Sequence, residues 1–250
     1  MSNMEYKNEI QVQDKVSEDY EHIRYVNAYS VMYQNSWFKT MTLLIDQKGL
    51  ILDNGCGIGN LVELLPKNDI IGLDISKGML TKAKERMNTL VNGDSQRLPF
   101  KDETFDVIVC RSLLHHLPNP KEGVSEMYRA LKKNGEVIIS EPIQSILSKI
   151  PRKLVKGSKH FSEIHKDFKK IELISIIPDK FRIEEIRHVG YIAYPLLGFP
   201  DVVDLFRYFP FKKQVASFLI DFDRLLSTIP LINTQSWGII IKASKREEKS

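Results

Sequence analysis

The stretch that most constrains the fold runs from Leu50 to Asn60, where an apolar segment leads into a series of glycines. Residues 50–52 have the composition of a strand buried on both faces, and Asp53 follows them directly. Three glycines then stand at alternate positions: Gly55, Gly57 and Gly59. Without side chains they let the backbone turn tightly and approach a ligand closely. Residues 61–65 repeat apolar side chains at helical spacing, so we predict the strand, glycine turn and helix that begin a nucleotide-binding α/β sheet.

The spacing of the glycines distinguishes between ligands. The dinucleotide-binding fingerprint is G-x-G-x-x-G or G-x-G-x-x-A. Counted from Gly55, the third small residue falls on Asn60, and counted from Gly57 it falls on Val62, so both registers fail. The pattern is instead Asp53 followed by glycines at alternate positions, which is typical of S-adenosylmethionine (SAM) sites. Taken alone, the motif also fits an ordinary glycine turn in a doubly wound sheet.

Strand-like and helix-like segments alternate along the chain, which predicts a parallel sheet. The predicted strands are residues 50–52, 70–75, 90–92, 105–110, 136–140 and 181–189, with a closing strand at 237–243. Ligands of such sheets bind at the carboxyl ends of the strands. An acid stands at four of the first five of these ends: Asp53, Asp74, Asp94 and Glu141.

The composition is that of an ordinary soluble globular protein. The chain has 250 residues, 42% of them hydrophobic and 27% charged, with a net charge of +4, so nothing predicts general attraction to polyanions. Two cysteines, Cys56 and Cys110, cannot form a disulfide framework, which favours a reducing compartment. No signal peptide and no apolar run of the ~18 residues of a transmembrane helix is visible. We therefore predict a cytoplasmic protein.

Several motifs carry a family resemblance because they follow one another in order and spacing. They are Leu52-Asp53-x-Gly55-x-Gly57-x-Gly59, Gly72-Leu73-Asp74-Ile75-Ser76-x-x-Met79-Leu80, Gly93-Asp94-Ser95-x-x-Leu98-Pro99-Phe100, Phe105-Asp106-Val107, Leu114-His115-His116-Leu117 and Leu131-Lys132-x-x-Gly135-Glu136. With these motifs, residues 49–142 resemble the class I SAM-dependent methyltransferases, in particular the small-molecule group (methyltransferase type 11) that includes the ubiquinone and menaquinone C-methyltransferases. One departure is Lys133-Asn134, where the family often has Pro-Gly.

The resemblance implies an α/β fold with a doubly wound, Rossmann-like, seven-stranded sheet. Residues 49–142 would form the SAM-binding core, preceded by a helical N-terminal extension over residues 1–48. Residues 143–250 would complete the same domain. The large apolar residues between the sixth strand and the closing strand, which lie outside the resemblance, predict a helical cap over the substrate at 191–235. SAM is the implied cofactor, S-adenosylhomocysteine the product, and no metal is expected.

The resemblance also implies a role for each cofactor-binding residue. For the methionine part, Asp53 would hold the ammonium and Arg111 would lie near the carboxylate, with the three glycines as the cradle. Asp74 would hold the ribose hydroxyls. The adenine contacts would come from the following residues: Ile75 and Met79 on its two faces, Asp94 at its amino group, and the Ser95 amide at the ring edge. For Met79, packing in the core is an equal alternative.

Methyl transfer needs mainly the alignment of nucleophile, carbon and sulfur, and a base only where the nucleophile must lose a proton. His116 and His115 are the candidate bases because they titrate near neutral pH and follow the fourth strand. A structural or SAM-shielding role is the alternative for both. His160, Glu163 and His165 lack the spacing of a zinc helix, so we predict no metal site there.

The residues outside the SAM-binding core at 49–142 indicate the kind of acceptor. Residues 149–170 are strongly basic and residues 191–232 are rich in large apolar side chains, which together favour a small, amphiphilic, anionic acceptor such as a lipid-linked glycan or a prenylated metabolite. The acceptor atom would be oxygen or carbon, and peripheral contact with a membrane fits this reading. Tyrosines spaced along residues 20–33 indicate a helix that packs on the sheet, or else a lid over the site.

Two other classes of function are compatible with a SAM site. The first is an RNA methyltransferase, but strand four ends in Cys110-Arg111-Ser112-Leu113 and lacks the Asp/Asn-Pro-Pro-aromatic motif of enzymes that methylate base amino groups. We therefore expect no nucleic-acid partner. The second is a SAM-binding protein without catalysis, against which the complete ligand set argues.

Overall fold

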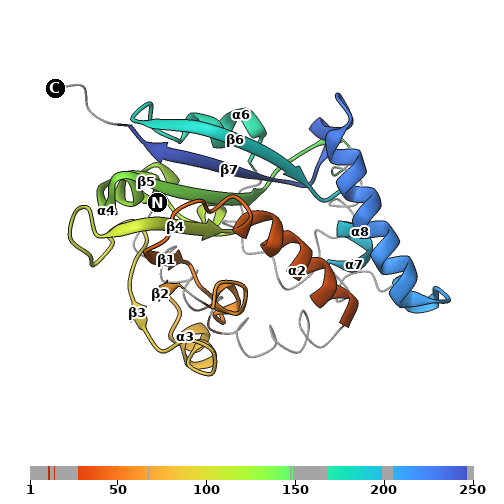
Figure 1. Cartoon of the computed structure of the whole chain (residues 1–250), viewed down its shortest axis with the longest axis horizontal. Coiled ribbons are helices and arrows are strands. Elements are labelled where there is room, and N and C mark those ends of the chain that lie inside the picture. Colours follow the sequence, from red (N-terminus) through yellow and green to blue (C-terminus); the bar gives the residue numbers. More distant parts are fainter. Residues whose placement is uncertain are drawn as a thin grey trace.

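The computed structural model describes residues 11, 14, 28–66, 68–146, 148, 168–198 and 205–246. Within them a seven-stranded sheet has the order β3-β2-β1-β4-β5-β7-β6 (Figure 1). The strands are β1 Leu50–Asn54, β2 Asp69–Asp74, β3 Leu90–Asn92, β4 Phe105–Arg111, β5 Leu131–Pro142, β6 Phe181–Val189 and β7 Gly238–Lys245. The predicted doubly wound α/β sheet is confirmed, and most strand bounds agree within two residues.

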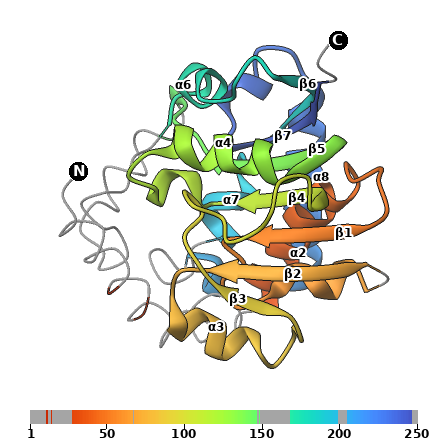
Figure 2. The ribbon, with the colours of Figure 1, turned by 90° about the vertical axis from the view of Figure 1, so that its left-hand side faces the viewer.

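The parallel strands have their carboxyl ends at the same edge of the sheet. Strands β1 to β5 pair in parallel, and Figure 2 shows β1, β2 and β4 pointing the same way. Strand β7 is antiparallel to both β5 and β6, so β6 runs with the first five strands. The end of β6 at Val189 therefore lies on the same edge of the sheet as Asp53 and Asp74.

Strand β5 begins earlier than predicted. The helix before it ends at Ala130, and Leu131 already pairs with Phe105 of β4. A register shift follows, and Asn134 within it has a φ of 61°, a left-handed conformation that Asn tolerates better than most residues. The Asn134-Gly135 pair is thus part of an irregularity inside the strand.

Helices cover both faces of the sheet. The α-helices are α2 Ala28–Thr42, α3 Lys77–Ala83, α4 Pro120–Ala130, α6 Lys170–Ser175, α7 Ala193–Leu197 and α8 Lys212–Thr228. The short 3-10 helices are η1 Asn60–Leu64, η2 Leu114–His116, η3 Leu205–Tyr208 and η4 Asn233–Gln235. Side chains of α4 and α6 share one apolar core with the sheet, and side chains of α2, α7 and α8 share the other.

The helix predicted after the glycine turn is only the single 3-10 helix η1. Pro66 explains its length, because the residue before a proline is disfavoured in the α conformation, and Leu65 has φ −127° and ψ 51°. Of the apolar residues in η1, Leu61 is the fully buried one.

Helix α2 packs its aromatic stripe against the sheet. Tyr33, Trp37, Phe38 and Met41 are all buried, in one cluster with the sheet residue Val107. The core-packing interpretation of the stripe therefore holds for residues 28–42. The earlier tyrosines, Tyr20 and Tyr25, lie outside the described residues.

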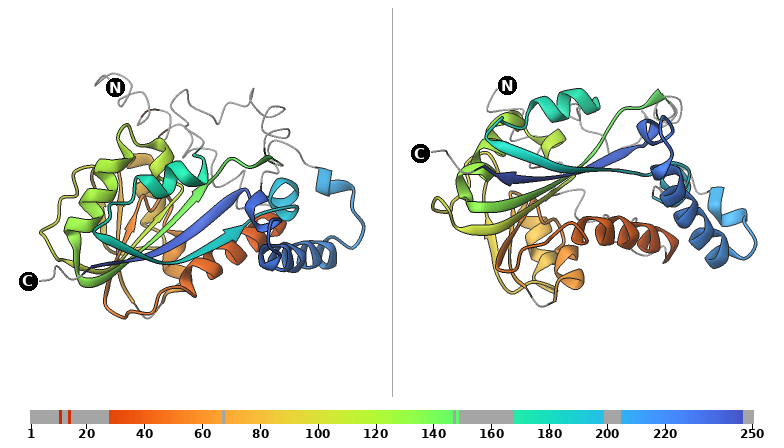
Figure 3. Two further views of the ribbon diagram at one scale, coloured as in Figure 1. Left: turned by 90° about the horizontal axis from the view of Figure 1, so that it is seen from above. Right: turned by 45° about the horizontal axis from the view of Figure 1, so that its top comes forward.

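The predicted cap at 191–235 is described in two parts, 191–198 and 205–235. Its helices α7 and α8 contact α2, and α8 also contacts β6 (Figure 3). The insertion thus packs against α2 and the end of the outer strand β6. Most of the basic stretch, and the group His160, Glu163 and His165, lie outside the described residues.

Candidate cofactor-binding and active site

The glycine turn after β1 requires glycine at each of its three positions. Gly55, Gly57 and Gly59 have φ values of 78°, 53° and 81°, which residues with a side chain rarely adopt. The turn is fixed by Leu73, whose carbonyl accepts the N–H groups of Gly55 at 2.8 Å and Cys56 at 3.0 Å. A Cβ at Gly57 would meet nothing within 4 Å, so open space adjoins the turn where a ligand would lie.

Asp74, at the end of β2, faces this turn. Its carboxylate accepts the N–H of Gly57 and the N–H of Ser76, each at 2.9 Å. Burial raises the pKa of Asp74, and these N–H groups act in the opposite direction. The Asp14 carboxylate lies close by, accepting from Ser76 Oγ at 2.5 Å and from the Gly78 N–H at 3.1 Å. Several carboxylates therefore gather at one side of the turn.

Asp53, the last residue but one of β1, is a third carboxylate of this cluster. Its side chain is almost fully buried. Burial and, to a smaller extent, the nearby Asp74 raise the pKa of Asp53 to about 7, and Arg111 opposes the shift. A buried carboxylate with this environment favours a cationic ligand, which would hold it in the ionised form.

The loop after β3 joins the site through Ser95 and Asn54. Ser95 Oγ donates to Asn54 Oδ1 at 2.7 Å, and Asp94 Oδ1 accepts the N–H of Gln96 at 2.8 Å. Asn54 Nδ2 is buried and makes no hydrogen bond within the described part of the chain. Sequence reasoning missed Asn54, although its place between Asp53 and the glycines was a usable signal.

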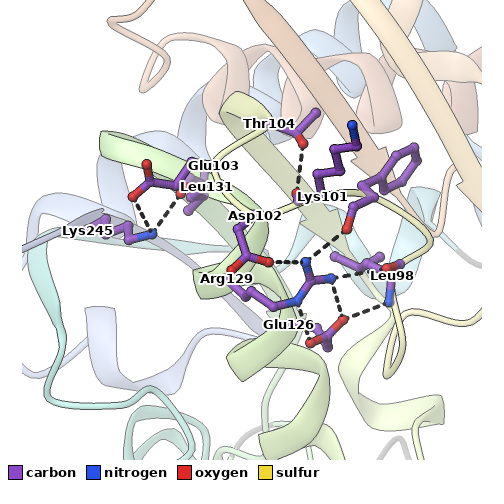
Figure 4. A network of polar contacts seen from close by, with 10 residues as sticks. Leu98, Lys101, Asp102, Glu103, Thr104, Glu126, Arg129, Leu131 and Lys245 are labelled. Atoms are coloured by element: carbon purple, nitrogen blue, oxygen red, sulfur yellow. Dashed lines mark hydrogen bonds and ion pairs between the residues drawn. The ribbon is translucent and has the colours of Figure 1, made fainter.

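Arg129 of α4 explains the conformation of the rest of this loop (Figure 4). Its guanidinium donates to the carbonyls of Leu98 at 3.1 Å and Phe100 at 2.8 Å. It also donates to Glu126 at 2.8 and 2.9 Å and to Asp102 at 2.7 Å. The Leu-Pro-Phe motif is thus held at its backbone, which fixes the segment leading from Asp94 and Ser95.

Arg111, at the end of β4, is held by helix α2. Its guanidinium lies 4.1 Å from the ring centre of Phe38 and 5.8 Å from that of Trp37, and it donates to Gln34 Oε1. Its Nε is buried and has no hydrogen-bond partner among the described residues. The aromatic stripe of α2 therefore serves the core and also supports a cation beside Asp53. This contact could not be read from the sequence.

The two histidines of η2 differ in environment. His115 is buried, and its Nδ1 lies 2.6 Å from Glu141 Oε2. His116 is partly exposed, and its ring centre is 4.1 Å from that of His115. His116 lies near enough to Asp74 and Glu141 to lower the pKa of both carboxyl groups slightly. Sequence reasoning noted Glu141 as an acid at a strand end but gave it no role.

Comparison with known proteins identifies the family. Residues 52–139 match the family model described as a methyltransferase domain. An uncharacterized protein of Methanocaldococcus jannaschii is 31% identical over 179 residues, which cover 71% of this chain and 80% of that protein. A SAM-dependent methyltransferase of Thermotoga maritima has the same fold, with a TM-score of 0.65 at 19% identity over 95% of this chain and 100% of that chain. The chain belongs to the class I SAM-dependent methyltransferases.

A demethylmenaquinone methyltransferase of Lactobacillus johnsonii is 32% identical to this methyltransferase over 133 residues. The match covers 47% of this chain and 54% of that enzyme, so the chain spans about half the length of that relative. Within the described part of this chain, no helix is both long and apolar enough to cross a bilayer.

The remaining predicted residues are placed as follows. Ile75 is anchored by its carbonyl, which accepts from Asn92 Nδ2 at 2.8 Å. Met79 is buried on α3, and its N–H donates to the N-cap Ser76 at 3.1 Å. Cys56 and Cys110 are buried, free thiols whose pKa values burial raises well above the ordinary range. Thiols in this state are poor nucleophiles, so both cysteines act as small hydrophobic residues of the core.

A cavity of about 460 Å³ lies between α2, α8 and β6 of the methyltransferase. Its apolar lining includes Trp37, Val189 and Ile220, and its cationic lining includes Arg187 and Arg224. Trp37 also supports Arg111, so a single indole ring lies in contact with both the cavity and the cation at the end of β4.

Proposed function

We propose that this methyltransferase binds SAM in the glycine turn and transfers its methyl group to a small, amphiphilic, anionic acceptor, at an oxygen or a carbon. The observation that carries the proposal is the open space beside Gly57, whose N–H donates to Asp74, together with the buried carboxylate of Asp53, which is close enough to Asp74 to interact with it electrostatically. SAM carries a cationic ammonium, a ribose diol and a flat apolar base, and this edge of the sheet offers a matching group for each.

The proposed contacts are those that the family resemblance implies, and the position of the side chains around the glycine turn supports them. Asp53 binds the ammonium, Asp74 accepts from the ribose hydroxyls, and Arg111 binds the carboxylate with the help of its buried Nε. The adenine is enclosed by the side chains of the following residues and the backbone around them: Ile75, Met79, Asp94 and Ser95. Ser95 also bonds Asn54, which ties the adenine end of the site to β1.

SAM supplies a methyl group on a sulfonium, which is already a good leaving group. The task of the chain is therefore to align the acceptor with the methyl carbon and to exclude water. Where the geometry is fixed, such positioning can lower the activation barrier by ~7–11 kcal/mol. A hydroxyl acceptor must also lose a proton, and His115 and His116 are the candidates to receive it.

The cavity between α2, β6 and α8 supports the proposed class of acceptor. Its volume of about 460 Å³ lies in the range of small-molecule sites. Its lining combines apolar walls with Arg187 and Arg224, which are ion-paired with Glu185 and Asp221, and with Asp223, whose carboxylate accepts backbone N–H groups. The name of the Lactobacillus johnsonii relative, a demethylmenaquinone methyltransferase, supports a small-molecule acceptor of apolar character. A cytoplasmic location stays a prediction.

The experiment is incubation of the protein with methyl-labelled SAM and separate lipid, glycan, small-metabolite and RNA fractions. Label in the lipid, glycan or metabolite fraction supports the proposal, and mass spectrometry then locates the methylated atom. Label in RNA alone would contradict the proposed acceptor class. SAM binding without label in any fraction would favour a binding protein without catalysis.

A further inference from the structure

Helix α8 carries an apolar stripe on its exposed side. The members of this α8 stripe recur three, four and seven residues apart, which places them on one face of the helix. They are Phe211 at the N-cap, Phe218, Phe222, Leu225 and Ile229 at the C-cap. Phe211, Phe218 and Leu225 are 77%, 64% and 56% exposed. The rings of Phe218 and Phe222 stack on each other with their centres 5.8 Å apart.

The other side of α8 is buried in the molecule. Ala216, Ile220 and Asp223 face inward, and the helix contacts α2, α7 and β6. Because successive residues of a helix lie about 100° apart around its axis, these buried residues are roughly opposite the α8 stripe. Figures 1 and 3 show α8 at the periphery, beyond the ends of β6 and β7. The α8 stripe therefore faces outward.

The segments that flank α8 expose further apolar side chains. Tyr208 and Phe209 precede the helix, Leu231 and Ile232 follow it, and Leu231 is 82% exposed. Phe211 itself has φ 49° and ψ 44°, a left-handed conformation that is uncommon for a residue with a side chain. A concentration of exposed aromatic and aliphatic side chains marks a surface that binds a partner or a membrane.

The charge at the start of the α8 stripe is positive. Lys212 and Lys213 begin α8, whose first turn contains no acid. This order is unfavourable for the helix itself, since a helix N-terminus already carries a partial positive charge. Asp221 is paired with Arg224 at 2.8 Å, and the buried Asp223 accepts backbone N–H groups. An anionic partner would therefore meet two lysines beside the first phenyl ring of the stripe.

We propose that the α8 stripe docks on the surface of a bilayer that contains anionic lipids. The aromatic and aliphatic side chains enter the region between head groups and acyl chains, and Lys212 and Lys213 lie at the lipid phosphates. A second copy of this chain would also cover the stripe, but a symmetric pair has the same positively charged surface on both sides of the contact. The lysines therefore favour an anionic bilayer as the partner.

The docked helix also borders the acceptor cavity. Ile220, Arg224 and Ser227 of α8 line that cavity from the side of the helix opposite the stripe. The inference deepens the proposed function and rests on it in one respect, because it names the source of the acceptor. The acceptor is an amphiphile held in the bilayer, which reaches the cavity along α8 without passing through bulk water.

The first test is sedimentation of the full-length protein with vesicles of equal parts phosphatidylcholine and phosphatidylglycerol. We expect the wild type to bind, and Phe218→Ser/Leu225→Ser to bind at least ~10-fold more weakly, because two apolar side chains no longer enter the lipid. Both positions are exposed, so the variant should keep the circular dichroism of the wild type. The matched control is Ile171→Ser, which removes an apolar side chain that is 81% exposed on α6 and should leave vesicle binding unchanged.

A second variant tests the charge and leaves the stripe intact. Lys212→Gln/Lys213→Gln should bind the mixed vesicles about tenfold more weakly, since two lysines no longer face the lipid phosphates. Its binding to vesicles of phosphatidylcholine alone should match that of the wild type. Lys101→Gln/Lys121→Gln removes two exposed lysines elsewhere on the surface and should bind the mixed vesicles as the wild type does.

Failure of the wild type to bind the mixed vesicles, or equal binding by Phe218→Ser/Leu225→Ser, would overturn the inference. A wild-type dimer in analytical ultracentrifugation that this variant converts to a monomer, together with no binding to vesicles, would show that the stripe pairs with a second copy instead. Vesicle binding is measured without SAM. Absence of SAM binding would therefore contradict the proposed function and leave the docking result standing, whereas SAM binding and methyl transfer without vesicle binding would contradict the docking alone.

The link between docking and the acceptor has its own readout. With methyl-labelled SAM and the lipid fraction incorporated into vesicles, Phe218→Ser/Leu225→Ser should transfer label much more slowly than the wild type. With the same lipids dispersed in detergent, the two proteins should transfer label at equal rates. Equal rates in vesicles, or no label in any lipid, would exclude the bilayer as the source of the acceptor.

Discussion

The backbone N–H of Gly57 donates to the Asp74 carboxylate at 2.9 Å, which joins the glycine turn after β1 directly to the end of β2. The second oxygen of the same carboxylate accepts the N–H of Ser76, at the start of α3. Asp74 thus orders the two backbone segments that border the proposed ribose site, and it retains acceptor capacity for a ligand because each oxygen has two lone pairs.

Substitution of Asp74 tests the cofactor site. A charged hydrogen bond contributes about 1.5–3 kcal/mol, so Asp74→Ala should weaken SAM binding at least tenfold in calorimetry, with unchanged circular dichroism. Asp69→Ala, an exposed acid at the other end of the same strand, serves as the control and should bind SAM normally. Unchanged affinity of Asp74→Ala for SAM would exclude the assigned site. Preferential binding of NADH over SAM by the wild type would exclude SAM as the cofactor.

The raised pKa of Asp53 predicts a pH dependence of SAM binding. Because burial and Asp74 raise this pKa to about 7, the carboxylate is largely neutral below that pH and largely ionised above it. The ammonium of SAM interacts with the ionised form, so the dissociation constant should fall as the pH rises from 6 to 8. Asp53→Asn should flatten this dependence and bind SAM more weakly at pH 8. A wild-type dissociation constant that is constant between pH 6 and 8 would contradict the prediction.

The hydrogen bonds between Arg129 and Glu126 predict that part of the free energy of unfolding is lost at acidic pH. Arg129 holds the pKa of Glu126 below its ordinary value, chiefly through their hydrogen bonds. A lowered pKa in the folded state stabilises the protein above the unfolded pKa of about 4.3, and this stability is lost as the pH falls through the folded value. Arg129→Met should therefore lower the free energy of unfolding by about 1–3 kcal/mol at pH 7 in urea titrations.

The difference between wild type and Arg129→Met should shrink at pH 3. Arg182→Met, which removes an exposed ion pair with Glu184, is the matched control and should cost about 0–1 kcal/mol at pH 7. Equal stability losses in the two variants would show that the backbone contacts of Arg129 add nothing to loop stability.

The cavity between α2, β6 and α8 can be filled without disturbing the cofactor site. Ser227 of α8 lines the cavity, and Ser227→Trp should block it. We expect SAM affinity within about threefold of the wild type and loss of transfer to the native acceptor. Ser217→Trp places the same ring on the exposed side of α8 and should leave transfer unchanged. Normal transfer by Ser227→Trp would show that the acceptor lies elsewhere.

Local patterns in the sequence predicted the sheet and the ends of its strands well. Apolar runs bounded by acids and glycines are short-range signals, so Asp53 and Asp74 could be placed from the order of residues alone. The hydrogen bond between Glu141 and His115 could not be predicted from the sequence. It joins segments 26 residues apart whose relative position depends on the pairing of β4 with β5.

The support of Arg111 by α2 was unpredictable for a similar reason. A stripe of aromatic residues at helical spacing indicates a buried face, but it does not say which strand end that face meets. Phe38 and Trp37 reach Arg111 only once α2 has packed across the sheet. The shortening of η1 was, by contrast, readable in principle from Pro66, because the restriction that proline places on its predecessor is local.

The contacts of Trp37 limit which substitutions could change the acceptor specificity of this methyltransferase. The indole donates its N–H to Ser140 at 2.8 Å, packs against Tyr194 at 5.3 Å, supports Arg111 and lines the cavity. Any exchange at this position would disturb folding and cofactor binding together with acceptor choice. Adaptation to a new acceptor is therefore expected to proceed through the facing wall on α8, where Ser227 and Arg224 can vary at a small cost in stability.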